Sequence, residues 1–266
     1  MQIASVQIGV AEGDKAQNLD RAAEKVRQVR GVDLVVLPEL WNIGFLSYDR
    51  YMSDAEGTDG PTLGMLMELA KEVGAYLHTG SFVERDGDRY YNSSYLLSPQ
   101  GEILANYRKL HLFGYQSREA QILSRGDKVV VADTPLGKLG MATCYDLRFP
   151  EVFRRMVDLG AEVFLVCSAW PYPRLEHWLM LNRVRALENQ SFLVSANSVG
   201  PSQGSVFMGH SMIVNPWGVI MASGGDEEVI LRAELNVREV TEARDRFPAL
   251  ADRLDWLNPK AEPDPS

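Results

Sequence analysis

Hydrophobic positions follow two different rhythms in the first half of the chain. Between residues 15 and 30, Leu19, Ala22 and Val26 recur at helical spacing with charged residues between them. The run VDLVVLPEL (32–40) is almost continuously apolar, which is typical of a strand covered on both faces. These two patterns predict helices at 15–30 and 61–74 and strands at 2–10, 32–40 and 75–85.

Beyond residue 85 the apolar segments become shorter and alternate with polar positions. Turn signals at Asp86-Gly87 and Pro99-Gln100-Gly101 separate them, which predicts an antiparallel meander. Later patterns predict helices at 150–160 and 175–190, strands at 161–170, 191–200 and 227–236, a hairpin at 210–223 and a polar helix after it. We expect one α/β domain with mixed sheets over residues 1–258 and a polar, proline-rich tail at 259–266.

Composition and charge narrow the functional classes. The 266 residues are 45% hydrophobic and 24% charged, as in an ordinary globular domain. A net charge of -9 without a dense Lys/Arg stripe argues against a nucleic-acid partner. No apolar run approaches the ~20 residues that span a bilayer, so we expect no membrane contact. Two cysteines and no secretory pattern at the N-terminus favour a reducing, cytoplasmic location.

Three reactive side chains stand where predicted strands end. Glu39 closes the run LVVLPEL, Lys109 follows the meander in YRKLHLFG, and Cys144 closes KLGMATC. Ligands of open α/β sheets bind beyond the carboxyl ends of strands, so we expect the three to converge on one crevice. Each also has a structural interpretation on its own: a paired carboxylate, a solvated lysine and a small buried thiol.

One chemical interpretation accounts for all three residues together. A cysteine attacks as a thiolate, a carboxylate in a dry pocket can take and return protons, and a lysine can stabilise an oxyanion. Glu39, Lys109 and Cys144 therefore predict acyl transfer through a thioester. A binding or scaffold module of the same fold is the non-enzymatic alternative.

The blocks LPELWNIGF, YRKLHLFG and CYDLRFPE resemble, in order and spacing, the Glu, Lys and Cys blocks of the carbon–nitrogen hydrolase family, also called the nitrilase superfamily. The resemblance extends from IASVQIGV to VILRAELN. It implies a four-layer α-β-β-α sandwich, a homodimer or higher even assembly, and no metal or organic cofactor.

The same resemblance implies a role for each residue. Glu39 would be the general base, Cys144 the nucleophile, and Lys109 an oxyanion donor together with the backbone N–H of Tyr145. Glu119, in the family-like spacing E…LSRGD, would be a second glutamate that orients the lysine or the substrate. An exposed loop carboxylate is the alternative at that position.

The implied reaction is hydrolysis of a small aliphatic carboxamide to an acid and ammonia. The Tyr-Asp pair after Cys144 resembles the amidase and omega-amidase branches, whereas the nitrilase branch carries Trp-Glu there. N-carbamoyl-amide hydrolysis and nitrile hydrolysis stay open as alternatives on the same scaffold.

Aromatic side chains that flank the catalytic blocks are candidates for the pocket wall. They are Trp41, Phe45, Phe113, Tyr115, Tyr145 and Trp170. Arg148 and Glu151 are interpreted as a structural ion pair or interface residues, and Cys167 as buried filling.

Three rival chemistries have weaker support. The motif GPSQG (200–204) matches the G-x-S-x-G of serine hydrolases but lacks the following helix and a downstream Asp-then-His order. A Cys–His pair with His111, His177 or His210 has no local signature, and His111 is expected to be a loop histidine near the site that packs or bonds locally. The two cysteines are too widely spaced for a zinc motif.

Overall fold

The computed structural model describes residues 1–11 and 14–254, so the expected tail at 259–266 lies outside the described residues. The strands are β1 (Gln2–Gln7), β2 (Leu34–Val36), β3 (Tyr76–His78), β4 (Phe82–Asp86), β5 (Arg89–Leu97), β6 (Ile103–Arg108), β7 (Val130–Thr134), β8 (Gly137–Thr143), β9 (Val163–Ser168), β10 (Phe192–Asn197), β11 (Val199–Ser202), β12 (Ser205–Met208), β13 (Met212–Val214), β14 (Ile220–Ser223) and β15 (Val229–Glu234). The helices are α1 (Lys15–Arg27), α2 (Pro61–Val73), α3 (Glu119–Ile122), α4 (Pro150–Asp158), α5 (Leu175–Asn189) and α6 (Arg238–Arg246), with 3-10 turns η1 (Tyr48–Arg50) and η2 (Cys144–Arg148).

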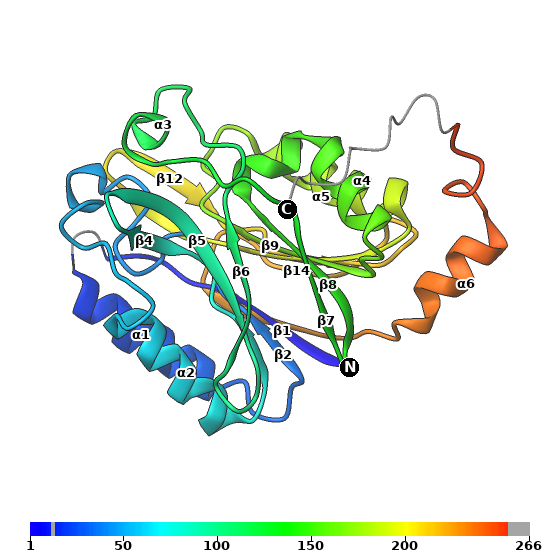
Figure 1. The fold of residues 1–266 in the computed structure, drawn as a ribbon, viewed down its shortest axis with the longest axis horizontal. Helices are drawn as coiled ribbons and strands as arrows, with labels where there is room; N and C mark the ends of the chain where they lie inside the picture. Colours follow the sequence, from blue (N-terminus) through cyan, green and yellow to red (C-terminus); the bar gives the residue numbers. More distant parts are fainter. Residues whose placement is uncertain (12–13, 255–266) are drawn as a thin grey trace.

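Two mixed sheets form the centre of the molecule (Figure 1). The seven-stranded sheet has the order β15-β1-β2-β3-β5-β4, with β6 also paired to β5, and the six-stranded sheet has the order β14-β13-β10-β9-β8-β7. Strands β1, β2 and β3 are mutually parallel, as are β8, β9 and β10. Because β5 is antiparallel to both β3 and β6, β6 again runs in the direction of β2.

Three apolar clusters separate four layers. The first joins the seven-stranded sheet to α1 and α2, the second fills the space between the sheets, and the third joins the six-stranded sheet to α4 and α5. Strand alternation assigns the faces: Leu34 of β2 lies in the central cluster and Val35 in the helix-facing one. Figure 1 shows α1 and α2 on one side of the sheets and α4 and α5 on the other. The expected α-β-β-α sandwich is confirmed.

The segment expected as one strand at 75–85 is two strands, β3 and β4. They are separated at Gly80, whose φ of +64° is a left-handed conformation. A Cβ at Gly80 would lie 2.0 Å from the carbonyl oxygen of Pro38, so glycine allows this turn to pack under the chain that leads to Glu39.

The GPSQG motif is a hairpin turn and not a nucleophile elbow. Its residues belong to β11 and to the turn into β12, where Gln203 and Gly204 both have positive φ. The helix that a serine nucleophile would require does not follow, because β12 pairs back onto β11.

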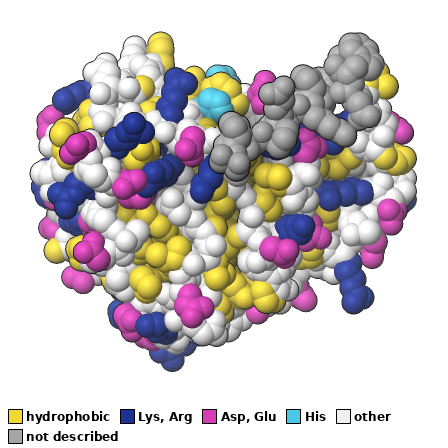
Figure 2. Space-filling model, in the orientation of Figure 1, with side chains coloured by type: hydrophobic (Ala, Val, Ile, Leu, Met, Phe, Trp, Pro, Cys, Tyr) yellow, Lys and Arg dark blue, Asp and Glu magenta, His cyan; other side chains and the backbone are white. Residues whose placement is uncertain are grey.

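Acidic and basic side chains intermingle on the face shown in Figure 2. Within residues 1–11 and 14–254, no helix is both long and apolar enough to cross a membrane.

His78 gives the fold a predictable pH dependence. Burial lowers its pKa from 6.5 to about 3, and its Nε2 has no hydrogen-bond partner. Between these two pH values the unfolded chain binds a proton that the folded chain does not, so stability falls as pH decreases from 6.5, by up to ~1.4 kcal/mol per pH unit. His78→Leu should flatten this dependence in urea unfolding measured from about pH 7 to pH 5. Equal slopes for the variant and the wild type would contradict the assignment.

Candidate active site

The structure brings Glu39, Lys109, Glu119 and Cys144 together at one edge of the two sheets. Glu39 lies just beyond β2, Lys109 follows β6 directly, and Cys144 follows β8 directly. Glu119 is the first residue of α3. The two glutamates and the lysine are fully buried, and Cys144 is 7% exposed. The sequence blocks thus meet where parallel strands end, as the crossover geometry of such sheets dictates.

The ammonium group of Lys109 lies between two carboxylates. Its Nζ is 2.7 Å from Glu39 Oε1 and 3.0 Å from each carboxylate oxygen of Glu119. Burial by itself would lower the pKa of Lys109, but the charges of Glu119 and Glu39 outweigh burial and hold that pKa well above its usual value. Lys109 is therefore a permanent cation at the base of the site.

Glu39 uses both of its carboxylate oxygens. Oε1 accepts from Lys109 and, at 2.8 Å, from the side-chain amide of Asn92 on β5; Oε2 accepts from the backbone N–H of Ala169 at 2.9 Å. The same Asn92 amide also lies 2.8 Å from Glu119 Oε1. Asn92 therefore fixes the two glutamates relative to each other. Nothing in YYNSSY (90–95) distinguishes this asparagine from any other strand residue.

Glu119 is anchored from a third direction. Its Oε2 accepts from the backbone N–H of Phe113 at 2.7 Å, and burial raises the pKa of its carboxyl group although Lys109 opposes that shift. The exposed loop carboxylate considered from the sequence is excluded, because Glu119 is fully buried.

Cys144 occupies a sharp turn at the end of β8. Its φ is +47°, which is uncommon for a residue with a side chain. It is the first residue of η2, whose N-terminus is capped by a capping box between Thr143 and Asp146. Burial and the neighbouring Glu39 carboxylate, to which the thiol is hydrogen-bonded, raise the pKa of Cys144 well above its usual value. The resting cysteine is thus a neutral thiol held against a carboxylate that can take its proton.

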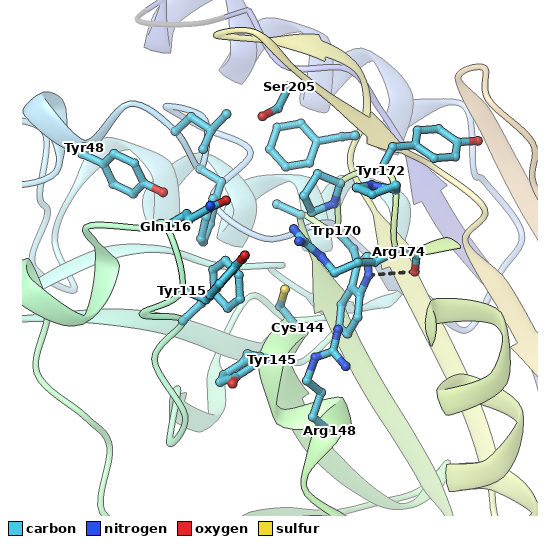
Figure 3. A pocket seen from close by; sticks show the side chains of 17 residues that line it. Tyr48, Tyr115, Gln116, Cys144, Tyr145, Arg148, Trp170, Tyr172, Arg174 and Ser205 are labelled. Atoms are coloured by element: carbon cyan, nitrogen blue, oxygen red, sulfur yellow. Dashed lines mark hydrogen bonds between the residues drawn. The ribbon is translucent and has the colours of Figure 1, made fainter. Parts of the chain in front are cut away.

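A cavity of about 210 Å³ opens above Cys144 (Figure 3). Its lining includes five of the six aromatic residues expected from the sequence: Phe45, Phe113, Tyr115, Tyr145 and Trp170. In Figure 3 the Cys144 sulfur lies at the centre, with Tyr115 and Tyr145 on one side and Trp170 on the other.

The structure corrects the expectation for Trp41. Its side chain is fully buried in the cluster between the seven-stranded sheet and helices α1 and α2, and it does not line the cavity. Its indole N–H donates to the carbonyl oxygen of Thr79 at 2.8 Å, which turns the ring away from Cys144. The position of Trp41 two residues after Glu39 therefore did not indicate a place in the pocket wall.

The cavity is also lined by two arginines, Arg148 and Arg174, which the sequence had not indicated as pocket residues. The guanidinium carbon of Arg148 lies 4.8 Å from the centroid of the Trp170 ring, and its Nη2 lies 3.2 Å from His177 Nδ1. The expected ion pair with Glu151 does not form among the described side chains. Arg174, the residue before α5, lies 5.7 Å from the Phe113 ring centroid. Within residues 1–11 and 14–254, neither guanidinium is ion-paired with a carboxylate. The only signal in the sequence was that Arg148 stands four residues after Cys144.

Other candidate chemistries do not assemble. Cys167 is fully buried with its Sγ 3.4 Å from Thr143 Oγ1, and burial raises its pKa to about 12. The ring nitrogens of His111 and His210 contact Asp146 and Asp226, and Nδ1 of His177 lies 3.2 Å from Arg148. The Cys144 thiol is hydrogen-bonded to Glu39 instead. No group of three or more His, Cys, Asp or Glu side chains in the described part of the chain could hold a metal ion.

Comparison with known proteins finds relatives that match most of this chain. The sequence profile of the carbon–nitrogen hydrolase family matches residues 2–245. The 2-oxoglutaramate amidase of Paenarthrobacter nicotinovorans is 36% identical, covering 95% of this chain and 89% of its own, and that of Bacillus subtilis is 35% identical, covering 94% and 96%.

Solved structures give the same result. Saccharomyces cerevisiae Nit3, a member of the nitrilase superfamily, superimposes with a TM-score of 0.85 at 32% identity, covering 93% of this chain and 94% of its own. An amidase from Nesterenkonia sp. AN1, bearing the acetamide moiety of fluoroacetamide on its active-site cysteine, has a TM-score of 0.81 at 26% identity, covering 94% and 95%. The protein is a member of the carbon–nitrogen hydrolase family.

Proposed function

We propose that this enzyme hydrolyses the terminal carboxamide of a small dicarboxylic acid monoamide, releasing ammonia. The observation that carries the proposal is a cavity that contains Cys144 together with Arg148 and Arg174. Guanidinium groups bind carboxylates through charge-assisted, often bidentate hydrogen bonds. The relatives named 2-oxoglutaramate amidase act, by that name, on such a monoamide.

Acylation begins from the neutral thiol. Glu39 takes the proton of Cys144 as sulfur attacks the amide carbon, so no free thiolate has to exist beforehand. The oxygen of the amide becomes an oxyanion near the Lys109 ammonium, with the Tyr145 N–H as the second expected donor. Glu39 then gives its proton to the nitrogen, ammonia leaves, and a thioester remains.

Deacylation uses the same groups in reverse. Glu39, again a carboxylate, takes a proton from water, and the oxygen of that water attacks the thioester carbon. The carbon–sulfur bond breaks, the acid leaves and the proton returns to the Cys144 sulfur. Glu119 holds Lys109 in place through both steps, and Asn92 holds Glu39.

The charges around the cavity also favour some monoamides over others. Its described lining contains Arg148 and Arg174 but no aspartate or glutamate. A 2-oxo acid offers only hydrogen-bond acceptors, whereas a 2-amino acid brings an ammonium group that the arginines repel. Unsubstituted and 2-oxo monoamides should therefore be preferred over glutamine.

The expected homodimer or higher even assembly and the cytoplasmic location stay predictions. Helix α5 supports an assembly, because it exposes Met180 and Leu187 while it buries Asn182 and Asn189. Apolar residues exposed together on a helix are a feature of protein interfaces.

A substrate panel tests the proposal. Ammonia release should be fastest with 2-oxoglutaramate, glutaramate and succinamate, slower with butyramide and glutamine, and slowest with N-carbamoyl compounds and nitriles. Cys144→Ala should lower turnover by more than about 10³-fold, since it removes the nucleophile. A preference for nitriles or N-carbamoyl compounds would refute the amide assignment, and activity that survives in Cys144→Ala would refute the mechanism.

Replacing the cavity arginines should separate carboxylate binding from chemistry. Arg148→Gln and Arg174→Gln should each raise KM for the best monoamide by about 10- to 100-fold, the effect of one charge-assisted hydrogen bond, and leave butyramide hydrolysis nearly unchanged. Arg155→Gln, on the exposed face of α4, is the matched control. Equal losses on both substrates would show that the arginines do not recognise the carboxylate.

Alkylation reports the protonation state of the nucleophile. Iodoacetamide should label Cys144, which the cavity reaches, and spare the fully buried Cys167. Because the pKa of Cys144 is raised above the usual 9.0, its labelling rate should still be rising when pH passes that value. Peptide mass spectrometry over about pH 7 to 10 measures both rates. A plateau below pH 9 would contradict the neutral resting thiol.

A further inference from the structure

One buried carboxylate joins the lysine segment to the cysteine turn. Asp146 is fully buried, and its Oδ2 accepts from Tyr107 Oη at 2.6 Å and from the backbone N–H of Thr143 at 2.9 Å. Its Oδ1 accepts from the backbone N–H of His111 at 3.1 Å and lies 2.8 Å from His111 Nδ1. Four groups on two segments therefore converge on a single side chain.

The contacts on the cysteine side fix the turn itself. Thr143 and Asp146 cap each other through a reciprocal pair of hydrogen bonds, and Cys144 lies between them with its φ of +47°. A non-glycine residue in that conformation persists only where its surroundings over-determine it. The reciprocal hydrogen bonds between Thr143 and Asp146 are the constraint that directly encloses Cys144.

The contacts on the lysine side bracket Lys109. Tyr107 lies two residues before it and His111 two residues after it, and both bond to Asp146. The His111 ring also stacks on Phe149 at a centroid distance of 3.6 Å, which holds the loop against the start of α4. The backbone on both sides of Lys109 is thus tied to the residue that caps the turn of Cys144.

Asp146 does not take part in the chemistry directly. It is not among the residues that line the cavity, and its hydrogen bonds go to Tyr107, Thr143 and His111. The charge of Lys109 is balanced instead by Glu39 and Glu119.

We propose that Asp146 is a positioning residue, which sets the location of the Cys144 thiol relative to the Lys109 ammonium by binding both segments at once. This inference rests on the proposed function, in which sulfur and ammonium act on the same carbonyl group. A misplacement of about 1 Å between reacting groups can cost about 10²-fold in rate.

Asp146→Asn is the informative variant. An amide has only one acceptor oxygen, so in either orientation its NH2 group would face the backbone N–H of Thr143 or of His111. We expect kcat for the best monoamide to fall by about 10²-fold, with KM within about threefold of wild type. Tyr107→Phe, which removes one of the four contacts, should lower kcat by about tenfold and serves if Asp146→Asn does not fold.

Glu56→Gln is the matched control. Glu56 is a buried carboxylate outside the cavity that accepts from Thr62 N at 2.7 Å and is ion-paired with Lys15. It should lower Tm about as much as Asp146→Asn and leave kcat within about twofold of wild type. If Asp146→Asn and Tyr107→Phe fold and lower only Tm, or raise KM with kcat unchanged, the positioning role is refuted.

Alkylation separates this inference from the proposed function. If the wild type hydrolyses none of the amides, the proposed function fails, but the location of the thiol can still be measured with iodoacetamide. Asp146→Asn should then speed labelling of Cys144 at pH 8 by about tenfold relative to Glu56→Gln, because a thiol displaced from Glu39 loses a carboxylate that raises its pKa. Equal labelling rates in the two variants would refute the positioning role without reference to any substrate.

Discussion

The buried ammonium of Lys109 is the charge on which the whole site depends. A cation buried at this depth without a partner would be strongly destabilised. Two buried carboxylates without a cation would repel each other, so that one of them would favour its protonated form. Glu39, Lys109 and Glu119 solve both problems at once, because each carboxylate lies within 3.0 Å of the same nitrogen. Burial and the neighbouring Glu39 carboxylate raise the pKa of the Cys144 thiol well above its usual value, so the proposed mechanism begins with a proton transfer from that thiol.

The two-sheet scaffold explains why these groups can meet. Glu39 and Lys109 come from strands β2 and β6 of one sheet, which run in the same direction and end at the same edge. Cys144 follows β8 of the other sheet, whose neighbour β9 leads to the Ala169 N–H that binds Glu39. The site therefore spans the interface between the sheets, and the central apolar cluster holds together the two sheets that carry its parts.

The sequence predicted the parts of the site that are carried by strand ends. Glu39, Lys109 and Cys144 each close an apolar run, and such runs are visible in one sequence. Asn92 was not predictable, because its partners lie 53 and 27 residues away and nothing in β5 marks it. Trp41 and Arg148 each lie close in the sequence to Glu39 or Cys144. Trp41 packs in a core cluster and Arg148 lines the cavity, and only the fold determines this difference.

The protonated state of Cys144 has a consequence beyond amide hydrolysis. Peroxide and other oxidants react with thiolates far faster than with thiols. A nucleophile whose pKa is raised by burial and by Glu39 presents little thiolate to them while the cavity is empty. In the proposed mechanism the sulfur becomes reactive only with the substrate carbonyl in place, when Glu39 accepts the proton as the carbon–sulfur bond forms. The burial and the Glu39 carboxylate that raise the pKa of Cys144 thus also protect its sulfur from oxidation while no substrate is bound.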